Sequence, residues 1–254
     1  GLLMLHYILT QHKTKGTMPS DPYFVKTIVT TDLQAKVAES FGVTVENTLT
    51  GFKWICGRMS EIEKESPERN FLFATEESFG YLNHDQVRDK DGVASIALLS
   101  EIALYYKLKG QNLMQALDSI YEEYGFSNET LVSLNYYGKE GAEKIIRIME
   151  NFRNFEPKEI CGQKIESLTD YKNLNIRNFE TGATEDLDFI KSNVLGFKFT
   201  NGNKLFLRPS GTEPKIKFYI MIQEAEGTLE SKKEKAHALS AQIVEFVKSE
   251  SERA

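Results

Sequence analysis

The chain has 254 residues, and with about 150 residues as a typical domain size this length suggests two domains rather than one large one. Its 41% hydrophobic and 27% charged residues exclude a disordered polymer. Its 31 Lys and Arg residues are outnumbered by 37 Asp and Glu residues, and the net charge of −6 argues against nucleic acid as a main partner, because it would repel polyphosphate. The two cysteines, Cys56 and Cys161, are too few for a disulfide framework and indicate reduced thiols in a cytoplasmic protein.

The N-terminal segment shows no sign of a membrane anchor or a signal peptide. The apolar stretch at residues 2–9 is interrupted by His6 and is far shorter than the roughly 18 residues that a membrane span requires. The chain begins with Gly1 rather than Met, and residues 2–11 already have the pattern of a buried helix. We therefore expect the sequence to be a fragment of a longer protein that is not bound to a membrane.

The first half of the sequence alternates strands and helices. A strand rich in β-branched residues at 24–30 is followed by a helix that Asp32 can cap and Gly42 can end. A short strand, a helix and a buried strand follow at residues 43–45, 51–65 and 70–75, and two apolar helices at 91–107 and 113–124. Such alternation is typical of a three-layer α/β domain with a mixed, largely parallel sheet, in which ligands bind at the carboxyl ends of the strands.

The second half has a different pattern. A mixed, polar segment at residues 126–141 is the best boundary between domains, and a helix is expected at 142–152. Strands are expected at residues 164–168, 192–200, 204–208 and 215–222, and a final helix at 229–249. Strands grouped between two helices are typical of a smaller α+β domain with an antiparallel sheet and packed helices. We therefore divide the chain into residues 1–135 and 136–254.

The segment with the densest set of anion ligands reads Arg-Pro-Ser-Gly-Thr-Glu-Pro-Lys, from Arg208 to Lys215. Arg208 can bind two phosphate oxygens at once, and Ser210 and Thr212 add hydroxyl donors. Gly211 lets backbone N–H groups curl around an anion, and Lys215 adds a positive charge. An ordinary hairpin uses the same turn residues, so composition alone leaves a phosphate site and a simple turn equally open.

A second segment, Thr-Glu-Glu-Ser-Phe-Gly at residues 75–80, follows the buried strand of the first half. A carboxylate can accept hydrogen bonds from two neighbouring sugar hydroxyls, so Glu76 together with Ser78 suits a polyol. The alternative is a solvated acidic turn. Adjacent side chains point in different directions, so Glu76 and Glu77 do not form the acid and base of a glycosidase.

Residues 87–92 read Val-Arg-Asp-Lys-Asp-Gly and have the acidic spacing of a metal loop. An EF-hand does not fit, because Val87 and Leu98 would occupy ligand positions without a side-chain oxygen. We expect Asp91 to cap the following helix instead. Lys90 would then lie at the N-terminal end of that helix, where a positive charge is unfavourable and indicates a role in proton transfer.

A fourth segment reads Thr-Gly-Phe-Lys-Trp at residues 50–54 and contains the only tryptophan of the chain. Gly51 precedes Lys53 and Trp54 there. Taken alone, the segment fits a core aromatic residue at the start of a helix.

The four segments together resemble the C-terminal half of the α-D-phosphohexomutases, the phosphoglucomutase and phosphomannomutase family. Residues 75–80 are similar to the family's sugar-recognition loop, residues 208–215 to its phosphate-binding loop, and residues 50–54 to the specificity loop of its third domain. Residues 87–92 are a fourth match in the same order. The sequences of residues 50–54 and 87–92 are most similar to the branch of the family that includes phosphoglucomutases acting also on pentose phosphates.

The resemblance implies that residues 1–135 are the third of the family's four domains and that residues 136–254 are the fourth, a TBP-like α+β domain. It implies that Lys90 lies near the reacting hydroxyl as a group for proton transfer or charge stabilisation. The residues that it assigns to substrate binding are Gly51, Lys53, Glu76, Ser78, Arg208, Ser210, Gly211, Thr212 and Lys215.

The resemblance also implies an isomerase that interconverts hexose 1-phosphate and hexose 6-phosphate through a phosphoserine and a glucose 1,6-bisphosphate-type intermediate. The sequence contains no Thr-Ala-Ser-His-Asn-Pro segment to supply that serine and no Asp-Gly-Asp segment to hold Mg²⁺. Both belong to the family's first two domains, so we expect the N-terminal half of the same enzyme to supply them and this chain to hold no metal. The alternative is a non-catalytic module that binds a sugar phosphate, and glucose, mannose, glucosamine and pentose substrates all stay open.

Overall fold

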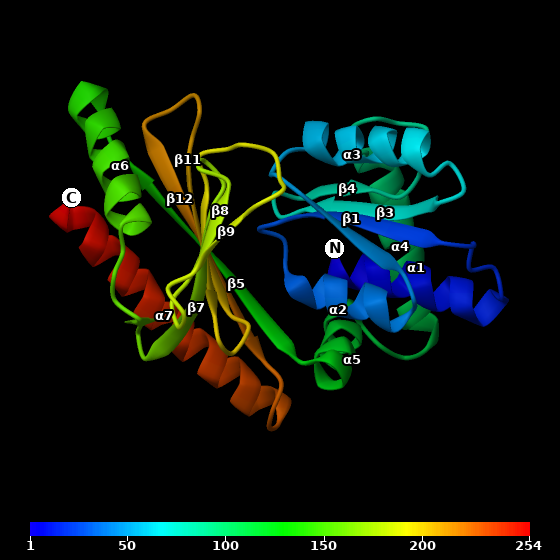
Figure 1. The fold of residues 1–254 in the computed structure, drawn as a ribbon. Coiled ribbons are helices and arrows are strands. Elements are labelled where there is room, and N and C mark those ends of the chain that lie inside the picture. Colours follow the sequence, from blue (N-terminus) through cyan, green and yellow to red (C-terminus); the bar gives the residue numbers. More distant parts are fainter. The chain divides into compact units, whose positions relative to one another are not determined.

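The computed structural model describes residues 1–254 as two compact units, Gly1–Gly125 and Phe126–Ala254 (Figure 1). The boundary lies ten residues before the predicted one at residue 135. The difference is strand β5 (Phe126–Asn135), which pairs along its whole length with β12 (Lys215–Glu224) and so belongs to the second unit. The partner strand lies far along the sequence, and polar residues dilute the alternation of β5, so local patterns did not reveal this pairing.

Unit 1 is a three-layer α/β domain, as the sequence predicted. Its four-stranded sheet has the order β2-β1-β3-β4, in which β1 is parallel to β2 and β3, while β4 runs antiparallel to β3. The strands are β1 (Pro22–Thr27), β2 (Thr44–Thr48), β3 (Asn70–Glu76) and β4 (Gly80–Leu82). The helices are α1 (Leu2–Lys15), α2 (Asp32–Ser40), α3 (Phe52–Glu65), α4 (Gly92–Leu108) and α5 (Leu113–Tyr124).

Strand β1 is the centre of this unit and is buried along its whole length. Its side chains alternate between the two faces of the sheet: Tyr23 and Val25 join Ile55 and Met59 of α3, whereas Phe24 faces the opposite layer. Because both faces are covered, apolar and aromatic side chains fall on both faces of the strand, and the buried Lys26 is the one charged residue among them. The strand overlaps the predicted one at residues 24–30 but ends at Thr27.

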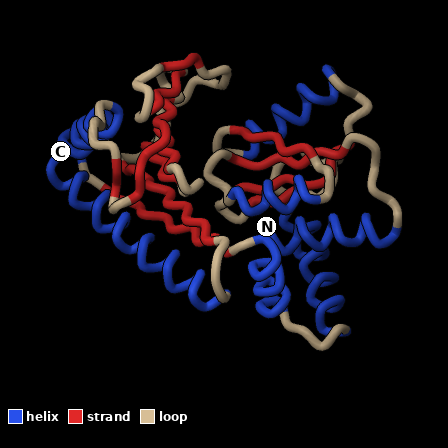
Figure 2. The backbone as a smooth tube through the Cα atoms, turned by 60° about the horizontal axis from the view of Figure 1, so that its bottom comes forward, coloured by secondary structure: helices blue, strands red, loops and turns tan.

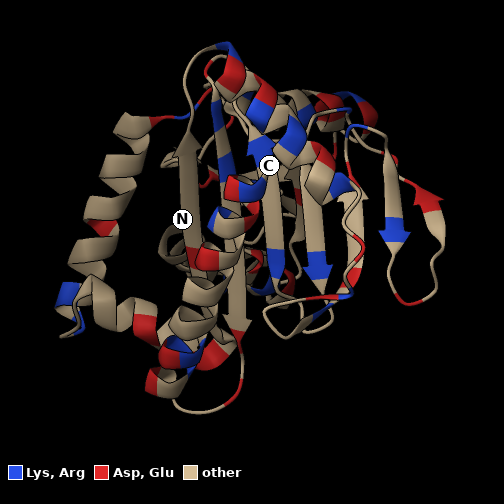
Figure 3. Ribbon diagram, turned by 90° about the vertical axis from the view of Figure 1, so that its left-hand side faces the viewer, with Lys and Arg blue, Asp and Glu red and all other residues tan.

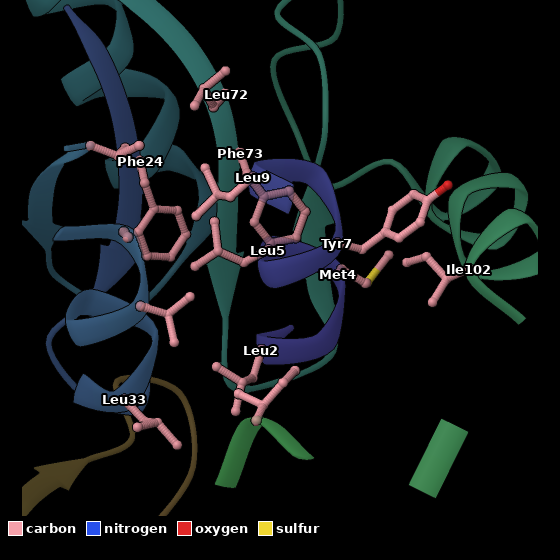
Figure 4. Close-up of a cluster of buried hydrophobic side chains, with 14 residues drawn as sticks. Leu2, Met4, Leu5, Tyr7, Leu9, Phe24, Leu33, Leu72, Phe73 and Ile102 are labelled. Atoms are coloured by element: carbon pink, nitrogen blue, oxygen red, sulfur yellow. The ribbon is translucent and has the colours of Figure 1, made fainter. Parts of the chain in front are cut away.

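The layer opposite α3 contains α1 and α2 (Figure 1). Figure 4 shows Leu5 and Leu9 of α1 lying against Phe24 and Phe73 of the sheet, where all four side chains are fully buried. Burying side chains of this size contributes roughly 1.5–3 kcal/mol each. On another side of α1, the Tyr7 hydroxyl donates to Glu101 of α4 at 2.7 Å, and burial together with this bond raises the pKa of Tyr7 to about 12.

Unit 2 contains an antiparallel sheet with the strand order β5-β12-β11-β10-β7-β8-β9, and β6 pairs with β7 (Figure 2). The remaining strands are β6 (Glu159–Ile160), β7 (Gln163–Asp170), β8 (Asn175–Asn178), β9 (Thr184–Asp186), β10 (Leu195–Phe199) and β11 (Lys204–Pro209). The helices are α6 (Gly138–Arg153) and α7 (Leu229–Arg253). The predicted α+β class is therefore confirmed, whereas β6, β8 and β9 were not predicted.

Helix α7 lies on the sheet with one face and exposes the other. Its buried residues recur at intervals of three or four, for example Ala236, Ser240, Ile243 and Val247. The Ser240 hydroxyl donates to Thr130 of β5 at 2.7 Å, which identifies the face of the sheet that α7 covers. The exposed positions of α7 include residues of both charges, such as Glu234, Lys235, Glu245 and Lys248. The ribbon of Figure 3 is coloured by charge and shows blue and red positions interspersed on the helices of the side that faces the viewer.

A buried ion pair joins the end of α6 to the sheet of unit 2. Arg153 Nε donates to Asp170 Oδ2 at 2.9 Å, and the two side chains are only 10% and 5% exposed. The Asp170 carboxylate also accepts hydrogen bonds from the Lys172 N–H at 2.9 Å and from Asn173 Nδ2 at 2.6 Å. The buried charge is thus neutralised and its oxygen atoms are hydrogen-bonded.

We predict that Asp170→Ala lowers the free energy of unfolding by about 3–5 kcal/mol, because it removes the buried carboxylate at Arg153 Nε and leaves the guanidinium only its more exposed partners Glu150 and Asn193. Urea unfolding measures this loss. Glu166→Ala is the control: it breaks an ion pair to Lys198 of 2.7 Å whose side chains are 39% and 47% exposed, and it should cost less than about 1 kcal/mol. Equal losses in the two variants would contradict the prediction.

Candidate functional site

The carboxyl edge of the sheet in unit 1 gathers the predicted site segments of that unit. Because β1 and β3 are parallel neighbours, their last residues, Thr27 and Glu76, lie at the same edge. The loop after β2 starts at this edge too, since β2 is parallel to β1, and it leads to Gly51 at the beginning of α3. The segments of Gly51 and Glu76 are therefore brought to one side of the sheet.

Glu76 is a buried carboxylate with only one oxygen engaged by the protein. Its side chain is 6% exposed, and Oε1 accepts a hydrogen bond from Lys90 Nζ at 3.3 Å. The other oxygen, Oε2, is buried and has no hydrogen-bond partner in the protein. A buried acceptor without a partner is unfavourable unless a ligand or water supplies a donor. The structure thus brings together the two residues Glu76 and Lys90 that the sequence singled out separately.

A close contact fixes the segment of Gly51 next to that of Glu76. The ring of Phe52 lies so near Gly80 that a β-carbon there would be 2.5 Å from it, and 2.7 Å from Glu76 Cγ. Only glycine fits at position 80. Gly51 has a φ of 116°, which also requires glycine. Lys53 Nζ lies over the Trp54 ring, 4.5 Å from its centre.

Lys90 is positioned by its neighbour Asp91. As predicted, Asp91 caps α4: its Oδ1 accepts from the Ala94 N–H at 2.9 Å. Its Oδ2 lies 2.9 Å from His84 Nε2, and the backbone N–H of Asp91 donates to the Tyr81 carbonyl at 2.9 Å. The hydrogen bond from Ala94, followed by that from His84, holds the pKa of Asp91 below its ordinary value. Sequence reasoning missed His84, because a single histidine in a polar loop gives no signal.

Glu77 connects the residues around Ser78 to β1. The Ser78 hydroxyl donates to Glu77 Oε1 at 3.2 Å, and the Thr27 hydroxyl donates to Oε2 at 3.2 Å. Thr27 is held in turn by the hydroxyl of Thr30 at 2.8 Å. The sequence analysis gave Glu77 no part in the site, whereas the structure shows it bridging the turn that carries Ser78 to the end of the central strand.

The predicted phosphate loop joins β11 to β12 and carries its positive charges on one face. Arg208 lies opposite Lys217 in the strand register, and alternation places Lys204 and Lys215 on the same face of the sheet, the one that α7 does not cover. Arg208 makes no hydrogen bond or ion pair. With Glu213 as the one acid between positions 204 and 217, four positive charges against one negative give a local charge of +3.

The turn of this loop directs two backbone N–H groups at one oxygen atom. Ser210 Oγ accepts from the N–H groups of Thr212 and Glu213 at 3.4 and 3.3 Å. A phosphate oxygen could be held by the same convergent pair of N–H groups only in place of the Ser210 hydroxyl that they bind here. The turn is closed by the Ser210 N–H, which donates to the Lys215 carbonyl at 2.7 Å.

The other side of the loop borders a pocket of about 420 Å³. Residues 209–214 line it together with apolar side chains of α6, among them Ile145 and Met149. Arg208 and Lys215 do not line this pocket, so the structure separates the loop's cationic face from its apolar side.

No group of three or more His, Cys, Asp or Glu side chains is arranged to hold a metal ion. None of the helices combines the length and the apolar character needed to cross a bilayer.

Comparison with known proteins shows what the chain is similar to. Residues 1–124 match the model of phosphoglucomutase/phosphomannomutase, alpha/beta/alpha domain III. Phosphoglucomutases of Staphylococcus saprophyticus and of Staphylococcus aureus strain MRSA252 are each 36% identical to it over 223 residues, which is 88% of this chain. The chain spans about 40% of the length of these family members.

Solved structures of the family have the same fold. The open form of pp63/parafusin, a phosphoglucomutase from Paramecium, matches 99% of this chain and 41% of its own with a TM-score of 0.62 at 18% identity. A phosphoglucomutase/phosphomannomutase family protein from Burkholderia thailandensis matches 98% of this chain and 41% of its own with a TM-score of 0.53 at 11% identity. At these identities the likeness concerns the fold alone.

We predict that inorganic phosphate shifts the amide NMR signals of residues 210–215, because the loop combines convergent N–H groups with an unpaired guanidinium. Arg208→Ala should weaken this binding roughly tenfold or more, since it removes charge-assisted hydrogen bonds. Lys158→Ala is the control, because it removes the same charge from an exposed position outside the loop. Shifts confined to other regions, or equal affinity of the two variants, would rule out the site.

Proposed function

We propose that this chain is the substrate-binding part of a phosphosugar mutase, an enzyme that interconverts hexose 1-phosphate and hexose 6-phosphate through a phosphoserine and a bisphosphate intermediate. The match of residues 1–124 to the domain III model and the similarity to phosphoglucomutases support this proposal at the level of the enzyme class. The observation that carries it furthest is the buried Glu76 carboxylate, with Oε1 on Lys90 and Oε2 without a protein partner.

Glu76 and Ser78 would hold the hydroxyl groups of the sugar. Oε2 of Glu76 can accept a hydrogen bond from a hydroxyl group, and the ion pair to Lys90 fixes the carboxylate in place. Ser78 lies in the turn directly after Glu76 and is oriented by Glu77. Gly51 and Lys53 would contribute from the start of α3, which Phe52 holds against the hairpin of Glu76.

The loop of unit 2 would bind the phosphate group that is not reacting. Arg208 would grip two phosphate oxygens, Ser210, Gly211 and Thr212 would donate hydroxyl and backbone hydrogen bonds, and Lys215 would add charge. In a mutase the substrate must be bound with either end toward the phosphoserine. A site that recognises one phosphate group and the ring hydroxyls can bind the sugar in both orientations, and so meets this requirement.

Lys90 would act at the oxygen atom that gains or loses the phosphoryl group. Phosphoryl transfer depends chiefly on positioning and on stabilising developing negative charge. The Lys90 ammonium, half exposed and held by Glu76, is suited to both. The phosphoserine and the Mg²⁺ that assists transfer would be held by the remaining part of the enzyme, and no step assigned to this chain depends on a metal ligand within it.

We predict that the purified 254-residue chain alone does not interconvert glucose 1-phosphate and glucose 6-phosphate, because binding groups without a phosphorylated nucleophile provide no route for transfer. A coupled assay for glucose 6-phosphate measures this. Turnover by the chain, free of contaminating enzyme, would contradict the assignment. If a complete protein carrying this segment binds the sugar phosphate but also shows no turnover, the alternative of a non-catalytic binding module is correct.

We predict that Glu76→Gln in the complete enzyme lowers kcat/KM about tenfold or more. The substitution keeps the size of the side chain but removes the charge that strengthens hydrogen bonds worth about 1.5–3 kcal/mol each, and 1.4 kcal/mol corresponds to a factor of ten. Glu77→Gln is the matched control. Its amide oxygen can still accept from Ser78, so its loss should be smaller. Equal, small losses of kcat/KM in the two variants would mean that Glu76 belongs to a solvated turn and does not bind the sugar. A larger loss for Glu77→Gln would identify Glu77 as the sugar ligand.

A further inference from the structure

The turn between β3 and β4 contains a residue that its geometry does not favour. Glu76 pairs with Gly80, so residues 77–79 form a three-residue hairpin loop, and Phe79 has a φ of 57°. The last residue of such a loop takes the left-handed conformation and is usually glycine. Here the glycine is the next residue, Gly80, where the Phe52 ring already requires it.

Phe79 is unfavourable in a second way, because its ring is 86% exposed. Of the four non-glycine residues with positive φ, only Phe79 is also an exposed large hydrophobic residue; the others are Asp21, Cys161 and Leu174. Cys161 is explained by its turn, since it precedes Gly162 in a two-residue hairpin loop between β6 and β7 that requires positive φ at both positions. No comparable requirement accounts for a phenylalanine at position 79.

The turn that carries Phe79 is held rigidly beside the candidate sugar ligands. Glu77 is bonded to Thr27 at the end of β1 and to Ser78, and Glu76 is bonded to Lys90. The strained residue therefore lies directly between Ser78 and the glycine that packs against Phe52. Strained residues of this kind persist where the surrounding structure fixes them, and they cluster at ligand sites.

A pyranose ring has two kinds of surface, hydroxyl groups around its edge and C–H groups on its faces. Glu76 and Ser78 can bind only the hydroxyl edge. An exposed aromatic ring is the side chain that packs against an apolar face. On the basis of the proposed function, we propose that Phe79 is a specificity-determining residue that packs its ring against the C–H face of the sugar and so selects a cyclic sugar phosphate.

A matched pair of ligands tests this assignment on the 254-residue chain. Glucose 6-phosphate has a pyranose face, whereas glucitol 6-phosphate has the phosphate and hydroxyl groups on an open chain without that face. Saturation-transfer NMR from the aromatic protons of the protein should reach the ring C–H protons of glucose 6-phosphate. Phe79→Leu should remove this transfer and lower the affinity for glucose 6-phosphate roughly 2- to 10-fold. Its affinity for glucitol 6-phosphate should stay unchanged.

Two further variants separate ring contact from folding. Phe79→Tyr keeps an aromatic ring and should restore the transfer and the affinity. Phe79→Gly relieves the backbone strain and should raise the thermal midpoint while losing the preference for the cyclic ligand. Equal affinity of wild type and Phe79→Leu for glucose 6-phosphate, or equal losses for both ligands, would overturn the role of Phe79 and leave the proposed function standing. No binding of either ligand by the wild type would overturn both.

Discussion

The contact between the Phe52 ring and Gly80 is the constraint on which the arrangement of unit 1's candidate site depends. It leaves no room for a β-carbon at position 80, and it fixes the start of α3 against the hairpin that follows β3. Glu76 belongs to the same contact through its Cγ atom, so the carboxylate is buried by packing and not by a separate pocket. One aromatic side chain in the first turn of a helix thereby sets the position of a polar residue on the neighbouring strand.

The hydrogen bonds around this contact make the edge of the sheet rigid. Asp91 fixes the start of α4 and with it Lys90, while Glu77 ties the turn of Ser78 to Thr27. Both carboxylate oxygens of Asp91 and of Glu77 have hydrogen-bond partners in the protein, whereas Glu76 has one oxygen without a partner. Glu76 therefore differs from Asp91 and Glu77 at this edge in its unsatisfied hydrogen-bonding capacity.

Local patterns were sufficient for the elements whose neighbours are close in sequence. The run of apolar residues in β1 and the cap at Asp91 are signals of this kind, and both are present in the structure. Strand β5 was missed because its own sequence is polar and has no clear strand pattern. It is stabilised by pairing with β12, which lies about ninety residues away in the sequence. The bridging role of Glu77 was missed for the same reason, since it depends on Thr27, fifty residues earlier.

The ion pair between Glu76 and Lys90 resolves an electrostatic conflict within the proposed function. A sugar phosphate carries both hydroxyl groups and negative charge. Its hydroxyl groups need a hydrogen-bond acceptor in the protein, yet an isolated carboxylate would repel its phosphate group. Lys90 cancels the charge of Glu76 at a distance of 3.3 Å and leaves the lone pairs of Oε2 available. The chain as a whole carries a net charge of −6, so attraction of the phosphate has to be local, and the +3 loop of unit 2 supplies it over roughly the 8 Å at which physiological salt screens charge. Under the proposed function, unit 1 thus offers a neutralised acid to hydroxyl groups, and unit 2 offers an excess of cations to phosphate.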